Sequence, residues 1–189
     1  MKLTTLDALL LFLVSHKGQS GYDIRQLFQS TPLGLFSDSP GAIYPALARL
    51  EMRSLLSSTA EPDGRRRRVY ERTAEGEAAL KGWLAAPVDP DAIVRRPQDL
   101  DLRYVMTAEM LGRPAAMAFI REYAAAQKAR HEAVVAFRDT AGKRMGRASQ
   151  DALELGVRLG ATRLQWFEDL LAEDGGLADE DDQTRRTGA

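Results

Sequence analysis

The stretch Ser39–Thr73 constrains the fold of this chain more than any other part of its 189 residues. It opens with Ser39-Pro40-Gly41, a typical helix start, because a proline at the first helical position needs no hydrogen-bond partner for its nitrogen. Apolar residues then recur at helical spacing and predict one buried face, formed by Ile43, Leu47 and Leu50. Two strand patterns follow, over 55–61 and 67–73, joined by a turn at Pro62-Asp63-Gly64. A helix followed by such a hairpin predicts a winged helix-turn-helix.

The flanking residues complete a small N-terminal domain over 1–86. A buried helix is predicted over 5–15, and a second helix follows Ser20, which can cap its N-terminus. Thr73 caps a further helix that ends at Pro87. The predicted order is therefore helix, helix, helix, hairpin, helix.

The remaining residues predict helices and no strands. The range 87–99 is rich in proline and charge and predicts a linker, whereas helical patterns over 100–174 predict a dimerisation and effector domain. Residues 175–189 have little to bury, which predicts a disordered tail. The expected fold class is mainly α with a small β-hairpin: an N-terminal winged helix-turn-helix and a C-terminal α-helical dimerisation domain.

An apolar seam runs along the last predicted helix. Its residues follow a 4-3-4-3-4 spacing that is typical of coiled coils: Leu153, Val157, Gly160, Leu164, Phe167 and Leu171. This seam predicts a homodimer in which two copies pair along it. The alternative is that the seam packs on the predicted helix over 113–140 of the same chain.

Charge is distributed unevenly along the chain. The net charge of −1 gives no general sign of a nucleic-acid partner, but seven arginines lie between Arg49 and Arg72, and four of them are consecutive in Arg65–Arg68. A local basic excess on a neutral protein is typical of a surface that contacts DNA.

Several other classes of protein are disfavoured. Without cysteine, the chain has no disulfide, no thiolate metal site and no cysteine nucleophile. His16 and His131 show no metal-ligand spacing, and no phosphate-binding loop or nucleophile motif is present, so we expect neither an enzyme nor a bound metal or cofactor. The apolar run over 8–14 is too short to span a membrane and no cleavage site follows it, so we expect a cytoplasmic protein.

Three regions resemble the PadR family of transcriptional regulators: Ser20-Gly21-Tyr22-Asp23-Ile24, then Gly41 through Glu51, then Arg68-Val69-Tyr70 with Thr73-Ala74-Glu75-Gly76. The resemblance covers residues 3–86, and its most specific part is Ile43-Tyr44-Pro45-Ala46-Leu47. The C-terminal part is similar to the longer subgroup of the family only in size and helical content. Two residues depart from the family pattern: Ser54 stands where glycine is usual, and Ala48 where a basic residue is common.

The resemblance implies a ligand-responsive transcriptional repressor that binds double-stranded DNA as a homodimer on a palindromic operator. The two copies are expected on half-sites about one helical turn apart. The alternative is a winged-helix module that contacts only proteins, against which the arginine run argues. Members of the family resemble sensors of phenolic or other aromatic compounds, so a small aromatic effector is expected between the two domains. Its predicted lining is Trp83, Tyr104, Tyr123 and Trp166, each of which is alternatively an ordinary core residue.

Twelve residues are candidates for DNA contact: Ser20, Gly21, Tyr22, Ser39, Pro40, Gly41, Tyr44, Arg49, Arg65, Arg66, Arg67 and Arg68. The two helix starts can bind phosphate through free backbone N–H groups, and the alternative is ordinary capping. The two tyrosines either donate hydrogen bonds to phosphate or pack the domain. Arg49 either contacts DNA, stays solvated or pairs with a nearby acid such as Glu51.

The arginine run is the strongest electrostatic signal. Side chains alternate along a strand, so Arg65 and Arg67 face one way while Arg66 and Arg68 face the other. A wing tip inserted into a minor groove uses both faces, whereas the alternative is a solvated turn.

The outward face of the third predicted helix offers Gly41, Pro45 and Ala48. None of them can make the bidentate base contacts that Arg, Asn or Gln make. We therefore expect the affinity to come from phosphate contacts and DNA shape. Pro45 removes a helical hydrogen bond, so this helix either starts after Ser39 or is kinked.

Overall fold

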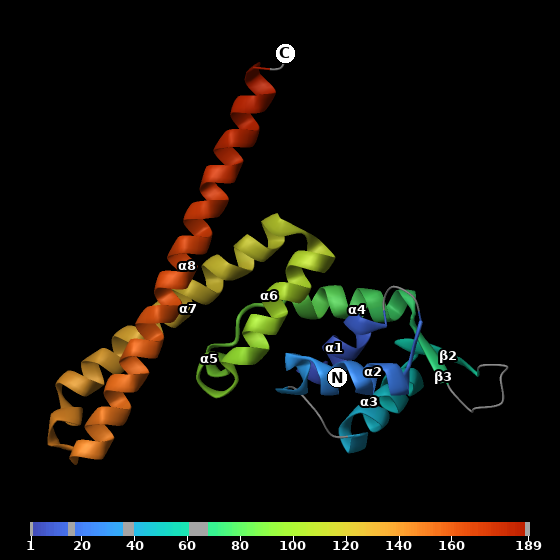
Figure 1. Ribbon diagram of the computed structural model, residues 1–189, viewed down its shortest axis with the longest axis horizontal. Helices are drawn as coiled ribbons and strands as arrows, with labels where there is room; N and C mark the ends of the chain where they lie inside the picture. Colours follow the sequence, from blue (N-terminus) through green and yellow to red (C-terminus); the bar gives the residue numbers. More distant parts are fainter. Residues whose placement is uncertain (1, 15–17, 36–39, 61–67, 188–189) are drawn as a thin grey trace. The chain divides into compact units, whose positions relative to one another are not determined.

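The computed structural model describes residues 2–14, 18–35, 40–60 and 68–187 (Figure 1). The chain divides into two compact units, residues 1–86 and 87–189. Helices dominate both units, and the first unit also holds a small antiparallel sheet. The expected fold class is therefore confirmed.

The first unit alternates helices with three short strands. Its elements are α1 (Thr5–Leu13), β1 (Gln19–Ser20), α2 (Gly21–Ser30), the 3₁₀ turn η1 (Pro32–Leu35), α3 (Pro40–Met52), β2 (Leu56–Ala60), β3 (Arg68–Arg72) and α4 (Ala74–Leu84). Strand β3 is central and pairs antiparallel with both β1 and β2. The hairpin of β2 and β3 extends away from the helices of this unit (Figure 1). The sequence does not predict β1, because two residues are too few to show a period.

The helices of the first unit enclose one apolar core. Its fully buried side chains include Leu9, Leu10, Ile24, Phe28, Ile43, Leu47, Leu50, Leu56 and Leu80. The predicted inner face of α3 is thus buried. Pro45 lies inside α3 on its exposed side, and the helix begins before it at Pro40 and continues past it to Met52.

The turn from α3 to β2 is a Schellman motif built on a serine. The N–H of Leu55 donates to the carbonyl of Leu50 at 3.0 Å, and the N–H of Ser54 donates to the carbonyl of Glu51 at 2.9 Å. Ser54 takes the left-handed conformation with φ 57°, where glycine is usual. The side chain of Thr73 also donates to the Ser54 carbonyl at 2.7 Å, which fastens this turn to the start of α4.

Gly76 in the first turn of α4 is required by close packing. A Cβ atom at this position would lie 2.0 Å from the carbonyl oxygen of Leu55. Helix α4 can approach the α3–β2 turn only because residue 76 has no side chain.

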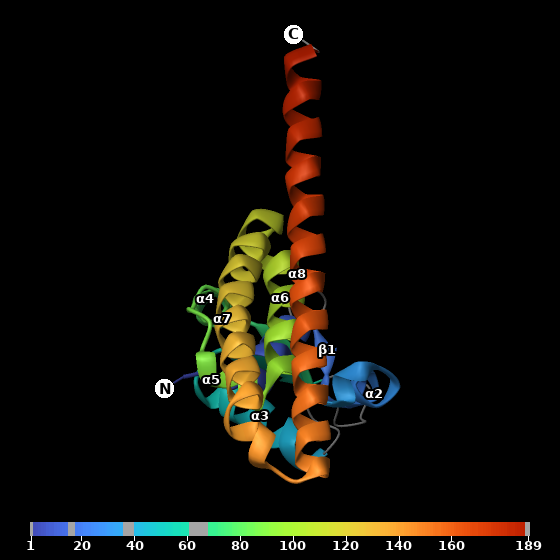
Figure 2. The ribbon, with the colours of Figure 1, turned by 90° about the vertical axis from the view of Figure 1, so that its left-hand side faces the viewer.

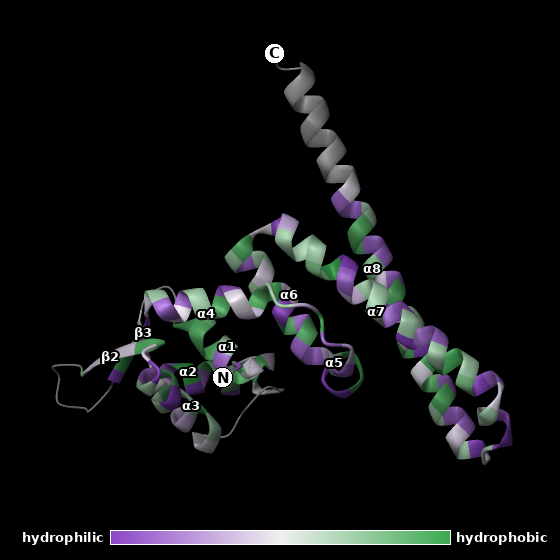
Figure 3. Ribbon diagram, turned by 180° about the vertical axis from the view of Figure 1, so that it is seen from behind, coloured by the Kyte–Doolittle hydropathy of each residue, from purple (hydrophilic) through white to green (hydrophobic). Residues whose placement is uncertain are grey.

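The second unit consists of helices. They are α5 (Pro90–Arg95), α6 (Pro97–Leu111), α7 (Arg113–Asp139), the 3₁₀ turn η2 (Ala141–Arg144) and α8 (Arg147–Thr187). Helix α7 packs against both α6 and α8 (Figures 1 and 2). Apolar and polar residues alternate along α7 and α8, as expected of helices that bury one face (Figure 3).

The predicted linker over 87–99 is wrong, because these residues fold as part of the second unit. They form α5 and the first turn of α6, and Val88 and Ile93 are buried in its core. Pro90 and Pro97 each occupy the start of a helix, where proline is favoured. The proline content therefore marks helix starts and not an extended segment.

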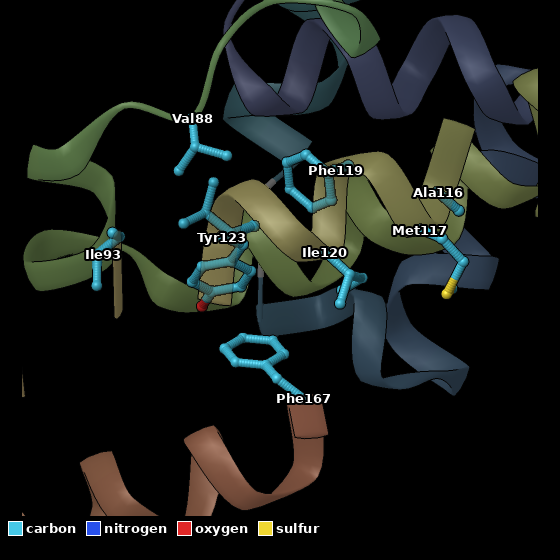
Figure 4. Close-up of a cluster of buried hydrophobic side chains, with 9 residues drawn as sticks. Val88, Ile93, Ala116, Met117, Phe119, Ile120, Tyr123 and Phe167 are labelled. Carbon is cyan, nitrogen blue, oxygen red and sulfur yellow. The ribbon is translucent and has the colours of Figure 1, made fainter. Parts of the chain in front are cut away.

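Aromatic side chains form the centre of the second core. Phe167 points from α8 toward the ring of Tyr123 on α7, with ring centroids 4.8 Å apart (Figure 4). Phe119 lies one turn before Tyr123, at 6.1 Å between centroids. Val88 points into the same cluster (Figure 4), so the chain that enters this unit is fixed to its core.

The C-terminal end also differs from the prediction. A disordered tail is expected over 175–189, whereas α8 continues as a helix to Thr187. Extending an existing helix avoids the cost of nucleation, so a segment with little to bury can still continue one.

Candidate nucleic-acid interface

The N-terminus of α2 lies against α3 at Gly21. A Cβ atom on Gly21 would lie 2.7 Å from Cε1 of Tyr44, so the absence of a side chain leaves room for this aromatic ring. Tyr44 remains 43% exposed, and Tyr22 on α2 remains 50% exposed. Two phenol groups on neighbouring helices are therefore accessible, and such groups can donate hydrogen bonds to phosphate.

Ser20 is a capping residue in this structure. Its hydroxyl accepts the backbone N–H of Asp23 at 3.2 Å and donates to the Asp23 carboxylate at 2.6 Å. The carboxylate in turn accepts the Ser20 N–H at 3.3 Å, which completes a capping box. The Ser20 side chain is buried and already engaged, so the capping alternative describes its contacts.

The first turn of α3 is described only in part. Ser39 lies outside the described residues, and for Pro40 the structure gives the backbone of the helix start. Gly41, Pro45 and Ala48 are exposed, so the outward face of α3 presents small residues and no bidentate base-reading group at these positions.

Arg49 pairs with a buried acid. Its Nη2 donates to Oδ1 of Asp7 at 2.6 Å, and the Asp7 side chain is only 2% exposed. The other Asp7 oxygen accepts the backbone N–H of Thr4, in the capping box of α1. A buried carboxylate needs such partners, and here they tie α3 to α1. Arg49 therefore has a partner that its neighbours in sequence do not reveal.

Arg68 is joined to α3 through Glu51. Arg68 Nη2 donates to Glu51 Oε1 at 3.2 Å, and the hydroxyl of Ser58 on β2 donates to the same oxygen at 2.7 Å. Next to them on β3, burial raises the pKa of the Tyr70 phenol above its usual range, while the Arg68 charge acts in the opposite direction. Arg65, Arg66 and Arg67 lie outside the described residues.

The second unit holds an open groove of about 1350 Å³ along α5, α6, α7 and α8. Of the four predicted effector residues, Tyr104, Tyr123 and Trp166 line it. Tyr104 and Trp166 meet edge to face with ring centroids 6.1 Å apart. Trp83 lies on α4 of the first unit and is not among the residues that line this groove, so its place in an effector site stays a prediction.

Three polar side chains, Asp101, Tyr123 and Arg163, line part of the groove. The Tyr123 hydroxyl donates to Asp101 at 3.4 Å and accepts a short hydrogen bond from Arg163. Arg163 also pairs with Asp101 at 3.3 Å. Burial, with the Asp101 charge beside it, raises the pKa of Tyr123 to about 12, and burial also raises the pKa of Asp101. At neutral pH the phenol is therefore protonated, and it donates to Asp101 while it accepts from Arg163.

The predicted dimer seam faces α7 of the same chain. Phe167 and Val157 are buried there, and a Cβ atom on Gly160 would lie 2.6 Å from Nδ1 of His131. The intramolecular alternative thus describes these positions, because an apolar spacing identifies a buried stripe and not the partner that covers it. The remaining seam residues are half-buried: Leu153, Leu164 and Leu171. Exposed apolar groups of α8 lie elsewhere, at Leu155, Leu159 and Trp166.

Residues 10–82 match the model of the Transcriptional regulator PadR-like family. The N-terminal unit is a PadR-like domain. The chain is also 56% identical over 43 residues to the Transcriptional regulator Rv3488 of Mycobacterium tuberculosis, a match that covers 22% of this chain and 40% of that protein. The match therefore spans less than half the length of this curated relative.

Solved structures of PadR proteins are similar to this chain at low sequence identity. The PadR-like regulator BC1756 from Bacillus cereus is 20% identical, with 90% of this chain and 97% of that chain covered and a TM-score of 0.39. Bacillus subtilis PadR in complex with operator DNA is 22% identical, with 90% and 99% covered and a TM-score of 0.41. The structure of the same Bacillus subtilis protein in complex with p-coumaric acid is 22% identical, with 90% of this chain and 98% of that chain covered and a TM-score of 0.40.

Two acids of the PadR-like domain carry contacts that sequence reasoning missed. Asp7 stands three residues after Thr4, a spacing that signals a capping box, but nothing near it in sequence predicts Arg49 as its partner. Glu51 has no local signal, because Ser58 and Arg68 reach it through the fold.

The described residues contain neither a metal-binding cluster nor a membrane-spanning helix. Within them, no three histidine or acidic side chains are grouped so as to hold a metal ion. None of the described helices has both the length and the apolar content needed to cross a membrane.

Proposed function

We propose that this chain is a homodimeric transcriptional repressor that binds a palindromic DNA operator and responds to a small aromatic ligand. The observation that carries the proposal is the exposed face formed by α2, α3 and the hairpin. Tyr22 and Tyr44 are open to solvent there, and Arg68 begins β3 directly after Arg65–Arg67 in the sequence. The family match over residues 10–82 supports the same function. Such a regulator acts in the cytoplasm, without a catalytic step.

The DNA-binding step uses phosphates and DNA shape in this proposal. The outward face of α3 offers Gly41, Pro45 and Ala48, which allow close backbone approach but cannot read base edges in bidentate fashion. The wing arginines supply the charge, and a minor groove accepts such side chains. Sequence preference then comes mainly from how easily the DNA adopts the required shape.

The dimer brings two such faces to two half-sites. A single winged helix covers little DNA, and paired half-sites lie about one helical turn apart. The exposed apolar residues of the second unit support pairing, since Leu155 is 58% and Leu159 62% exposed in the single chain. A contiguous exposed apolar surface is typical of an interaction site.

Ligand response is assigned to the groove of the second unit. Its aromatic wall of Tyr104 and Trp166 suits a planar ring, and Tyr123, Asp101 and Arg163 supply hydrogen-bonding groups. Pockets for small molecules commonly combine an apolar lining with a few convergent polar groups. The first probe is p-coumaric acid, the compound bound to Bacillus subtilis PadR.

Replacing Arg65, Arg66 and Arg67 with alanine tests the DNA-binding proposal. The plot of log affinity against log salt concentration should become flatter, by about 0.9 per lost phosphate contact. The measurement is fluorescence anisotropy on a duplex that the wild-type protein has selected from a random pool. Replacing Arg144, Arg147 and Arg158 removes the same charge from the second unit and should leave the slope unchanged.

Two results contradict the proposal at different levels. If the wing variant keeps the wild-type slope, the wing does not contact phosphates. If the wild-type protein enriches no duplex at all, the alternative of a winged-helix module that contacts only proteins is favoured.

A further inference from the structure

Glu51 occupies the point where α3 meets the wing. It lies in the last turn of α3, and its Oε1 accepts hydrogen bonds from Ser58 of β2 and Arg68 of β3, at 2.7 and 3.2 Å. One carboxylate oxygen therefore joins the helix to both strands of the hairpin.

The place of these two donors along the hairpin is informative. Ser58 pairs with Tyr70 in the β2–β3 ladder, and Arg68 pairs with Ala60 at the outermost rung that the structure describes. Side chains alternate along a strand, so Ser58, Arg68 and Tyr70 share the face directed at the body of the unit. Glu51 thus contacts the hairpin on this face at its middle rung and at its outermost described rung.

The contact is suited to setting an angle more than to adding stability. The Arg68 side chain is 57% exposed and that of Glu51 26% exposed, and ion pairs of this kind add little to the free energy of unfolding. The buried residues Leu55 and Leu56 and the Schellman turn hold the base of the hairpin without it. What Glu51 adds is a fixed direction for β2 and β3 relative to α3.

We propose that Glu51 is a positioning residue that fixes the wing relative to α3, so that the helix and the wing tip reach adjacent grooves of the operator together. This inference rests on the proposed function, because it assumes that both elements contact DNA. A carboxylate near DNA also repels phosphate, and the two roles predict opposite results. If Glu51 only repels DNA, removing its charge strengthens binding, whereas if it positions the wing, removing its contacts weakens specific binding.

The test compares Glu51→Ala, Glu51→Gln and Ser58→Ala with the matched control Glu71→Gln. Glu71 is the β3 residue on the opposite, exposed face, so its variant loses the same charge without touching the contact. Affinity is measured for the duplex that the wild type selects and for a shuffled duplex. Circular dichroism confirms that each variant is folded.

Glu51→Ala should lower the ratio of specific to non-specific affinity about tenfold. Glu51→Gln keeps an acceptor oxygen and should recover part of that loss, while Ser58→Ala should move the ratio in the same direction without any change of charge. A hydroxyl-radical footprint should lose protection in the minor groove under the wing and keep the protection under α3. Glu71→Gln should leave ratio and footprint as in the wild type.

The outcomes separate the two proposals. A wild-type protein that selects no duplex overturns the proposed function and this inference with it. A wild type that selects a duplex, together with a Glu51→Ala variant that binds it as tightly as Glu71→Gln does, overturns the positioning role alone. If Glu51→Ala fails to fold, the Ser58→Ala variant provides the test. An unchanged ratio of specific to non-specific affinity and an unchanged footprint in that variant overturn the positioning role.

Discussion

The two units use their apolar residues differently. In the PadR-like domain the leucines of α1, α3 and α4 meet in one core, and two of its large exposed side chains are the amphipathic Tyr22 and Tyr44. In the helical unit Phe167 of α8 packs against Tyr123 of α7 in a smaller core. Three other apolar side chains of α8 stay exposed: Leu155, Leu159 and Trp166. A domain that buries its apolar residues needs no partner to cover them, whereas an uncovered apolar surface is typical of an interaction site.

The largest effect is expected from Gly76→Ala, which should destabilise the first unit and leave the second unit folded. The new Cβ would lie 2.0 Å from the Leu55 carbonyl oxygen, so α4 must move away from the α3–β2 turn. We expect a loss of at least about 3 kcal/mol in the stability of the first unit. Thermal unfolding by circular dichroism should show this loss, with the helical signal of the second unit retained.

The control for Gly76→Ala is Gly82→Ala on the same helix. A Cβ atom on Gly82 meets nothing within 4 Å, and alanine is the better helix former, so stability should rise by about 0.5–1 kcal/mol. Equal effects of the two substitutions would show that α4 does not pack against the turn as described.

The second-largest effect is expected on dimerisation, which we propose uses the exposed apolar side of α8. Leu159→Glu places a charge on the exposed apolar side of α8, and the substitution occurs twice in a homodimer. The dissociation constant of the dimer should rise about 100-fold, which corresponds to about 2.7 kcal/mol. Sedimentation equilibrium over a range of concentrations measures it. Gln165→Glu adds the same charge on α8 outside the groove lining and should change the dimer little. A protein that is monomeric before any substitution would remove the dimer from the proposal.

The fold could be predicted where a pattern is long enough to repeat. Helix α3 and the hairpin of β2 and β3 follow from apolar spacing and turn residues, within one or two residues at each end. Strand β1 was not predictable from two residues. The segment with Pro90 and Pro97 was misread, because proline both breaks and starts helices and only the buried Val88 and Ile93 distinguish the two cases.

The candidate site was less predictable, because its contacts join residues far apart in the chain. Ser20 with Asp23 is a local pair and its cap can be read from the sequence. Arg49 with Asp7, and Glu51 with Arg68, meet only after α1, α3 and the hairpin have packed. The same limit applies to the α8 seam, since its spacing is equally compatible with α7 of its own chain and with a second copy.

The smallest effect concerns the joint between α3 and the wing. Ser54→Gly should stabilise the PadR-like domain by about 1 kcal/mol, because Ser54 holds φ 57° and glycine adopts this conformation without strain. Chemical denaturation measures the gain, and Ser57→Gly on β2 is the control, which should destabilise because its backbone is extended. The main-chain hydrogen bonds of Leu55 and Ser54 and the Thr73 contact remain in the variant, so the wing keeps its direction and DNA affinity should not change. If stability rises while affinity falls, the strained serine itself contributes to the geometry of the wing, and Glu51 does not set it alone.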